Sequence, residues 1–119
     1  MTSLDEFFGA HQESRRLFDV LHRRIEAIGF SEISVTKSQI AFRRKKAFAW
    51  AWIPGKYLRG KTAPLVLSLS FQEWDVSPRW KEIVKPVRGR SMHHLEINSA
   101  DEIDAEVDGW LQSAWNQAE

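Results

Sequence analysis

The chain has 119 residues, of which 43% are hydrophobic and 28% are charged, and its formal net charge is +1. These fractions exclude a disordered chain, and a single folded domain over residues 1–119 is expected at this length. No apolar run approaches the roughly 20 residues of a membrane span, and the absence of cysteine excludes disulfides and cysteine-bound metal. Because the first residues carry acids instead of the cations of a secretory signal, a soluble cytoplasmic protein is expected.

The first third of the chain predicts helices. Ser3 and Glu6 form a capping-box pattern, so a short helix begins near Leu4 and is interrupted at Gly9. From about residue 12, apolar residues recur at helical spacing up to Gly29, which suits the left-handed position after a last turn.

The middle of the chain predicts strands. Short segments alternate between apolar and small or polar residues, a period of two that is typical of strands. In the segment of residues 65–71, the face with Val66, Ser68 and Ser70 is expected to tolerate water, whereas the face with the Leu and Phe side chains must be covered. A loop is expected at residues 54–62. The predicted strands are residues 33–36, 39–42, 47–53, 65–71 and 91–97.

Two further helices are predicted in the second half of the chain. Ser77 followed by Pro78 indicates a short helix over residues 79–84. Ser99 and Glu102 form a second capping box, which predicts a last helix that runs nearly to the end of the chain. Together the elements predict an α+β fold with two layers. A meander-like antiparallel sheet of about five strands is expected, with the two long helices, N-terminal and C-terminal, packed on one face.

The charges are unevenly distributed along the chain. Residues 31–90 contain 13 Lys and Arg against four acids, whereas residues 91–119 contain seven acids and no Lys or Arg. This asymmetry predicts either a polyanionic partner for the middle segment or its neutralisation by an acidic C-terminal helix packed against the basic sheet. The second explanation is favoured for a compact domain of this size.

The turn between the second and third predicted strands is a candidate ligand-binding element. Four adjacent cations favour contacts with phosphates, but long charged side chains also keep exposed turns soluble, which is the favoured interpretation. These cations are Arg43, Arg44, Lys45 and Lys46.

The strand that follows the turn carries an aromatic face. Phe48, Trp50 and Trp52 alternate with alanines, so the three side chains are expected to share one face of the sheet. On an open face, Trp50 and Trp52 would stack on bases or other planar ligands. On the covered face they would fill the core, and this core interpretation is favoured for the three residues together.

His93 and His94 are the candidate catalytic residues. Neighbours on a strand point to opposite faces, so these two side chains cannot chelate one ion from one side, and neither a metal nor a cofactor is expected. One of them would serve as a general base or an anion contact if it faced the open surface. A structural histidine with satisfied hydrogen bonds is the favoured interpretation.

Several short blocks of the sequence occur in a distinctive combination. They are residues 38–44 (SQIAFRR), 48–50 (FAW), 93–95 (HHL) and 109–111 (GWL), the last preceded by Asp104. Together they resemble an uncharacterised family of small bacterial domains of unknown function, over nearly the whole chain. The resemblance implies a bacterial intracellular single-domain protein, and it brings no established activity, cofactor or catalytic residue.

The favoured function is a small non-catalytic binding module for an anionic ligand or nucleic acid, which uses the open sheet face and the basic hairpin. The first alternative is a protein–protein interaction domain, or a domain that forms a homodimer through its tryptophan-bearing face. The second alternative is a small enzyme that uses His93 or His94, although catalysis is less expected than binding. No membrane partner is expected.

Overall fold

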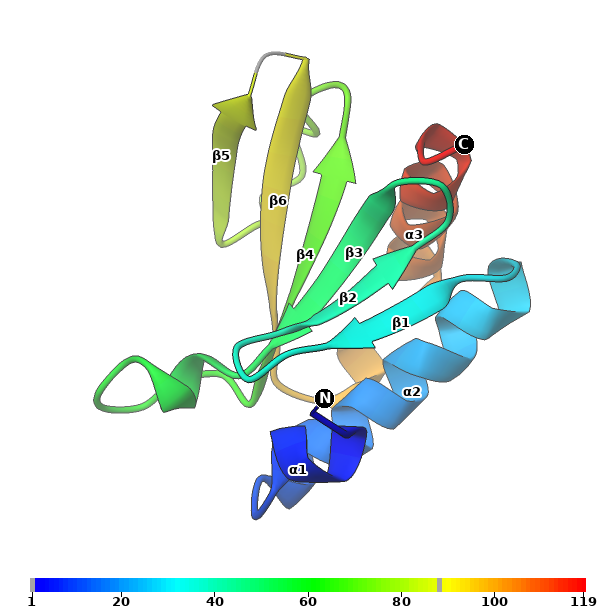
Figure 1. Cartoon of the computed structure of the whole chain (residues 1–119). Coiled ribbons are helices and arrows are strands. Elements are labelled where there is room, and N and C mark those ends of the chain that lie inside the picture. The colour runs from blue at the N-terminus through cyan, green and yellow to red at the C-terminus, as the bar shows by residue number, and fades with distance from the viewer. Residues whose placement is uncertain (1, 88) are drawn as a thin grey trace.

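The computed structural model of the chain describes residues 2–87 and 89–119. Within this part the chain forms three α-helices, two 3₁₀ turns and one six-stranded sheet (Figure 1). The helices are α1 (Leu4–Phe8), α2 (Gln12–Ile28) and α3 (Ala105–Gln117), and the 3₁₀ turns span Pro54–Lys56 and Ala100–Glu102. The strands are β1 (Glu32–Val35), β2 (Ile40–Arg43), β3 (Ala47–Trp52), β4 (Leu65–Phe71), β5 (Glu82–Val87) and β6 (Arg90–Ile97).

The sheet is antiparallel throughout, in the order β1-β2-β3-β4-β6-β5. The predicted α+β fold with an antiparallel sheet is confirmed. The helices α2 and α3 lie on the same side of the sheet (Figure 1). The first four strands form the expected meander, but β6 pairs with β4 and leaves β5 at the edge. No helix within residues 2–87 and 89–119 has the length and apolar composition needed to cross a membrane.

The helices cover the sheet face that carries Leu67 and Leu69 of β4. These residues pair with Ala51 and Ala49 of β3, and all four side chains are completely buried. Removing such apolar surface from water is the main favourable contribution to folding. The same core includes Leu17, Phe18, Leu21, Ile25, Ile40, Phe42, Leu65, Val107 and Leu111.

The other face of β4 is also buried, contrary to the prediction that it would tolerate water. Val66, Ser68 and Ser70 are only 4%, 2% and 8% exposed. β4 lies in the middle of the sheet, where side chains of the neighbouring strands can reach its small serines. The indole of Trp52 makes one such contact, because its Nε1 donates to Ser68 Oγ at 3.0 Å.

A β-bulge interrupts the alternation in β3. Phe42 of β2 pairs with Ala49, but the next residue, Arg43, pairs with Ala47, so Phe48 is the extra residue. Phe48 is 1% exposed and belongs to the core beneath the helices. The expectation that Phe48 shares a face with the two tryptophans that follow is therefore wrong, because the bulge shifts it to the covered face.

The short helix predicted at residues 79–84 is wrong, since this segment leads into strand β5. The Ser77 hydroxyl does accept from the N–H of Arg79 at 3.2 Å, but the turn is not continued as a helix. Instead Glu82 and Ile83 pair with β6, and Trp80 packs into the core at 8% exposure. Pairing with a free sheet edge outweighs a local helix signal of one turn. This strand raises the count from the expected five to six.

The last helix begins later than predicted. Ser99 and Glu102 belong to a 3₁₀ turn in which the Ser99 side chain makes no capping bond. Asp104 is the N-cap of α3, because its carboxylate accepts from the N–H of Val107 at 3.1 Å. The pKa of Asp104 is lowered, chiefly by this hydrogen bond.

Gly29 ends α2 for a reason that the sequence did not indicate. Its φ of 167° is extended backbone, which any residue adopts, so the predicted left-handed conformation is wrong. A Cβ atom at this position would lie 2.6 Å from Cζ2 of Trp115 in α3. Glycine is therefore required because the indole of Trp115 packs directly on its backbone.

Candidate functional site

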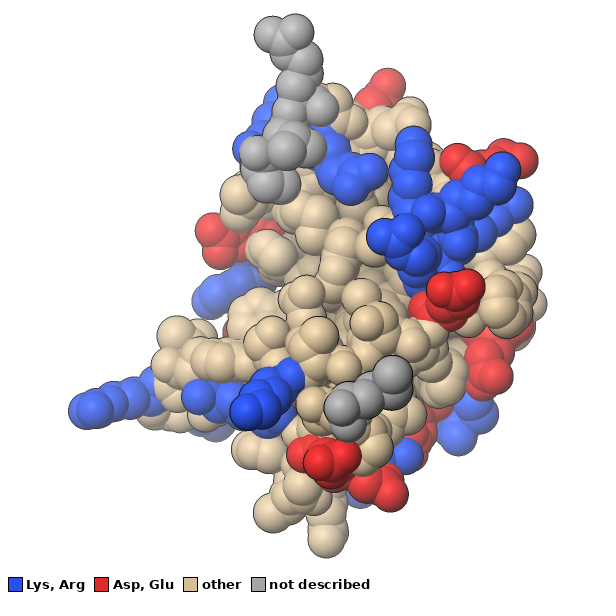
Figure 2. All heavy atoms as spheres, in the orientation of Figure 1, with Lys and Arg blue, Asp and Glu red and all other residues tan. Residues whose placement is uncertain are grey.

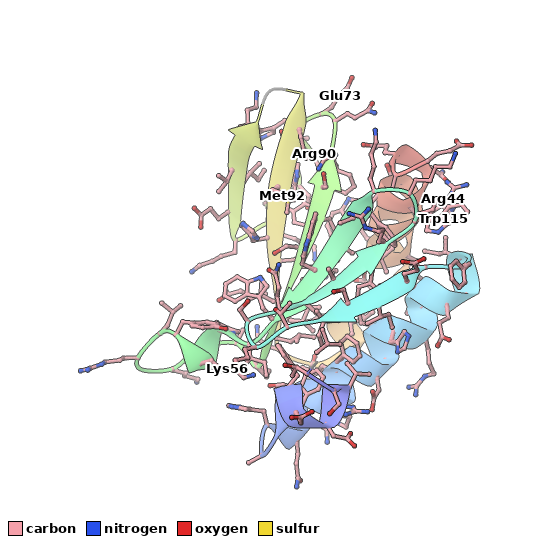
Figure 3. The ribbon with its side chains drawn as sticks, in the orientation of Figure 1. Arg44, Lys56, Glu73, Arg90, Met92 and Trp115 are labelled. Carbon is pink, nitrogen blue, oxygen red and sulfur yellow. The ribbon has the colours of Figure 1, made fainter. Side chains whose placement is uncertain are left out.

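A hollow of about 340 Å³ lies on the sheet face that the helices leave uncovered. Its floor comes from β3, β4 and β6, and its rim from the β1–β2 turn and the segment after β3. We call it the aromatic hollow. Among the described residues, no Lys or Arg lines it. Met92, which is labelled in Figure 3, lies on its β6 side. Its lining residues are Ser38, Gln39, Trp50, Trp52, Tyr57, Ser68, Met92 and His94.

The strand register places both tryptophans of β3 in this hollow. Trp50 lies opposite Ser68, which lies opposite His94, so the three side chains share the uncovered face. Trp52 follows on the same face, and both indoles are partly exposed. The core interpretation is therefore wrong for Trp50 and Trp52. The two residues do share one environment, as the alternation predicted.

A hydrogen-bonded chain holds Trp52 in place. Trp52 Nε1 donates to Ser68 Oγ, and Ser68 Oγ lies 2.6 Å from His94 Nδ1. The Ser68 oxygen accepts from the indole, and its own hydroxyl proton has Nδ1 as a partner when the proton of a neutral His94 is on Nε2. Burial lowers the pKa of His94, and the nearby Glu82 carboxylate opposes this shift. The neutral imidazole, which can accept the Ser68 hydroxyl at Nδ1, is thus the favoured form at neutral pH.

The pairing of Ser68 with His94 has the composition of a nucleophile and its general base. Ser68, however, is only 2% exposed and its oxygen is occupied by the indole of Trp52. A substrate carbonyl would have to displace that indole in order to reach the hydroxyl. The arrangement is suited to fixing an aromatic surface for stacking and leaves the partly exposed His94 as a hydrogen-bonding group beside it.

Lys56 anchors the segment that forms the rim of the hollow (Figure 3). Its ammonium donates to the backbone oxygen of Phe7 at 2.5 Å and lies 3.8 Å from the centre of the Phe7 ring. The next residue, Tyr57, is 55% exposed and donates its hydroxyl to the backbone oxygen of Ser38 at 3.2 Å. Sequence reasoning missed Tyr57 and Met92, because only the register and the path of this segment bring them beside the tryptophans.

The basic turn is attached to the far end of α3. The Arg44 guanidinium lies 3.6 Å from the centre of a Trp115 ring and donates to the backbone oxygen of Trp115 at 3.1 Å (Figure 3). Cations are favourable at a helix C-terminus, where the helix dipole is negative. Arg44 therefore has a structural partner within the same chain.

The other three residues of the basic turn also make hydrogen bonds with backbone oxygens of the chain. The backbone N–H groups of Lys45 and Lys46 both donate to the oxygen of Ala118, at 3.1 and 3.2 Å, and Arg43 donates to the backbone oxygen of Lys45. None of the four cations lines the aromatic hollow. The structure thus separates the two groups of predicted ligand-binding residues.

The acids of α3 are paired with cations outside the basic turn. The guanidinium of Arg79 lies 3.1 Å from Asp104 and 2.8 Å from Glu106, and Arg24 of α2 forms an ion pair with Asp108. These acids lie in the first turns of the helix, opposite to the end that the basic turn contacts. The acidic helix is neutralised within the chain, but not by the cations of the hairpin.

His93 points away from the aromatic hollow, as predicted for one of two neighbouring residues in a strand. It is completely buried; Nδ1 donates to the backbone oxygen of Ser91 at 3.2 Å, and Nε2 accepts from the N–H of Asp75 at 2.9 Å. Burial is the main reason that its pKa is lowered. The rings of Phe71 and Trp80 lie 4.8 and 5.0 Å from the imidazole. Since both nitrogens are engaged, His93 is a structural residue and not an available base.

The comparisons with known proteins supply a family but no activity. A family model described as "Domain of unknown function (DUF5655)" matches residues 4–118. No curated protein and no solved structure matches the chain. Within the described residues, no three His, Asp or Glu side chains are placed so that they could hold a metal ion together.

Proposed function

Because the chain belongs to the DUF5655 family, a family of unknown function, we propose a function from the site itself: a non-catalytic binding module that holds single-stranded nucleic acid on the open face of its sheet. The observation that carries the proposal is the position of Trp50 and Trp52 on the uncovered face. Stacking of bases on aromatic side chains accepts any base, since every base has a π-face.

The surroundings of the hollow support a ligand that is planar and anionic. Among the described residues, those that line the hollow carry no charge apart from the titratable His94, which suits a base and not a phosphate. In Figure 2, uncharged residues occupy the middle of the view, while Lys and Arg gather at the β2–β3 turn and at the segment after β3. Cations on both sides of an aromatic surface are the arrangement that tracks a sugar–phosphate backbone. The proposal includes a cytoplasmic location, where single-stranded nucleic acid is accessible.

Replacing Trp50 or Trp52 by alanine should weaken binding of an oligothymidine of about 12 nucleotides by roughly 5- to 150-fold, because a stacked base contributes about 1–3 kcal/mol. The measurement is a fluorescence titration at low salt, in which stacking on the wild-type protein should quench tryptophan emission. Trp74→Ala is the matched control, since Trp74 is 52% exposed and lies outside the hollow. No wild-type binding at low salt, or an equal loss in the Trp74 variant, would contradict the proposal.

A second candidate function is formation of a homodimer through the same face. Tyr57, Leu58 and Val84 are 55%, 59% and 39% exposed, and Val84 pairs with Met92 at the border of the aromatic hollow. A second copy of the chain would remove this apolar surface from water. The mass in solution at micromolar concentration should then be that of a dimer, and Val84→Lys should restore the monomer. A wild-type monomer under these conditions excludes this candidate.

A further inference from the structure

A second cavity lies next to the aromatic hollow, where β3 and β4 separate. The two strands pair from Ala49 and Leu69 onward, next to the bulge at Phe48 that interrupts the pairing of β3 with β2. Beyond this point residues of both strands and of α3 line a cleft of about 400 Å³. The helix α3 lies behind these ends of β3 and β4 in Figure 1. We call it the cationic cleft. Its lining residues are Lys46, Ala47, Phe48, Ser70, Phe71, Gln72, Gly89, Arg90, Ala114, Gln117 and Ala118.

Two cations line this cleft, and among the described residues no acid lines it. Lys46 comes from the β2–β3 turn, and Arg90, labelled in Figure 3, comes from the start of β6. Within residues 2–87 and 89–119, neither cation forms an ion pair with an acid. The backbone bond of Lys46 to Ala118 fixes the turn that carries it. The cleft therefore presents positive charge that the described chain does not neutralise.

The cationic cleft continues the aromatic hollow along the same strands. Ser68 lines the hollow and Ser70 lines the cleft, while Met92 and Arg90 do the same in β6. Residues two apart on a strand share a face and lie about 7 Å from each other. A ligand with a planar ring and an adjacent anionic group therefore fits both cavities at once.

From this geometry we infer that the cationic cleft is a phosphate subsite, which holds a backbone phosphate of the strand whose base stacks on Trp50 or Trp52. The inference rests on the proposed function and assigns distinct roles to the cations of the turn. Lys46 contacts the phosphate together with Arg90, and Arg44 is a structural residue held by Trp115. Lys45 does not line the cleft, although it is the neighbour of Lys46.

Charge-removing variants of neighbouring residues separate this role from a general charge effect. Lys46→Met and Arg90→Met should each lower the affinity for the oligothymidine. Each should also reduce the slope of log affinity against log salt, by up to about 0.7, which is the contribution of one neutralised phosphate in a single strand. Lys45→Met removes the same charge from an adjacent exposed position and should change this slope by less than half as much. Thermal unfolding of each variant checks that the fold is intact, and the quenching at saturation should stay at the wild-type level.

The outcomes distinguish the subsite from the function on which it rests. If the wild-type protein binds but Lys45→Met and Lys46→Met have equal slopes, the phosphate subsite is overturned while the stacking surface remains. If the wild-type protein does not quench with any oligonucleotide at low salt, the proposed function fails and the subsite fails with it. A reduced slope for Lys46→Met and Arg90→Met, with a change less than half as large for Lys45→Met, supports the assignment.

Discussion

Replacing His93 by alanine should lower the free energy of unfolding by about 2–4 kcal/mol, although the residue is remote from the proposed ligand. The imidazole is completely buried and accepts the backbone N–H of Asp75. Its removal leaves a cavity beside the ring of Trp80 and a buried donor without a partner. The Asp75 carboxylate in turn accepts from Trp80 Nε1 at 2.7 Å, so the segment that leads into β5 loses its support.

Chemical denaturation at pH 7 is the measurement, with His11→Ala as the control. His11 is exposed, caps α2 without a side-chain hydrogen bond, and should change the free energy of unfolding by less than about 0.5 kcal/mol when replaced. Equal effects of the two substitutions would contradict the structural role of His93.

The stability of the wild-type protein should also decrease as the pH falls below about 6.5. Burial is the main cause of the lowered pKa of His93, so the unfolded chain, with a His pKa near 6.5, binds more protons in this window. The stabilisation is complete above pH 6.5 and is lost progressively toward the lower pKa of the folded state. The slope of the free energy of unfolding against pH should be shallower in His93→Ala. The slope that remains in this variant reports on His94, whose pKa is also lowered by burial. The stabilisation by Asp104, whose pKa is lowered from 3.8, is fully present in this window and is lost only at more acidic pH.

Gly29→Ala should destabilise the protein by about 1–3 kcal/mol, although alanine tolerates the backbone conformation at this position. The new methyl group would meet the ring of Trp115 at 2.6 Å. That ring cannot yield without cost, because its Nε1 donates to the backbone oxygen of Phe30 at 3.1 Å and its face carries Arg44. Displacement of Trp115 should therefore loosen the β2–β3 turn as well.

Two measurements test this prediction. Thermal unfolding should show a lower melting temperature for Gly29→Ala, and amide hydrogen exchange should be faster at Lys45 and Lys46, whose N–H groups depend on the contact of the turn with α3. Gly109→Ala is the matched control. No atom lies within 4 Å of a Cβ at this exposed position of α3, and alanine there should stabilise the helix by about 0.5–1 kcal/mol. A stabilised Gly29→Ala variant would contradict the packing role of Trp115.

Local signals predicted most elements correctly where the pattern was long or self-contained. The capping box of Ser3 and Glu6 is present with both hydrogen bonds, and the periodicity up to residue 28 is a continuous helix. One-turn signals were less reliable, because their energies are small and a tertiary contact outweighs them. Ser77 begins a turn that leads to a strand, and Ser99 lies in a 3₁₀ turn that precedes the last helix.

The candidate site was predictable only in its residue types. The sequence singled out Trp50, Trp52 and His94, and the structure brings these three together with Ser68 in one hollow. The sequence-based prediction also grouped the basic turn with the tryptophans. Neighbours in sequence need not share a cavity, and here the turn is drawn to the C-terminal end of α3 by the stacking of Arg44 on Trp115.

By itself the sequence determined the fold class, the alternation of Trp50 and Trp52, and the family of the chain. These are properties of local periodicity and of residue identity, so they do not depend on what the chain packs against. Only the tertiary structure decided which sheet face the helices cover. An alternation is symmetric with respect to the two faces, and the choice depends on how well each face buries against the helices. Alanines and leucines accommodate α2 and α3, so the tryptophans lie on the face that remains open.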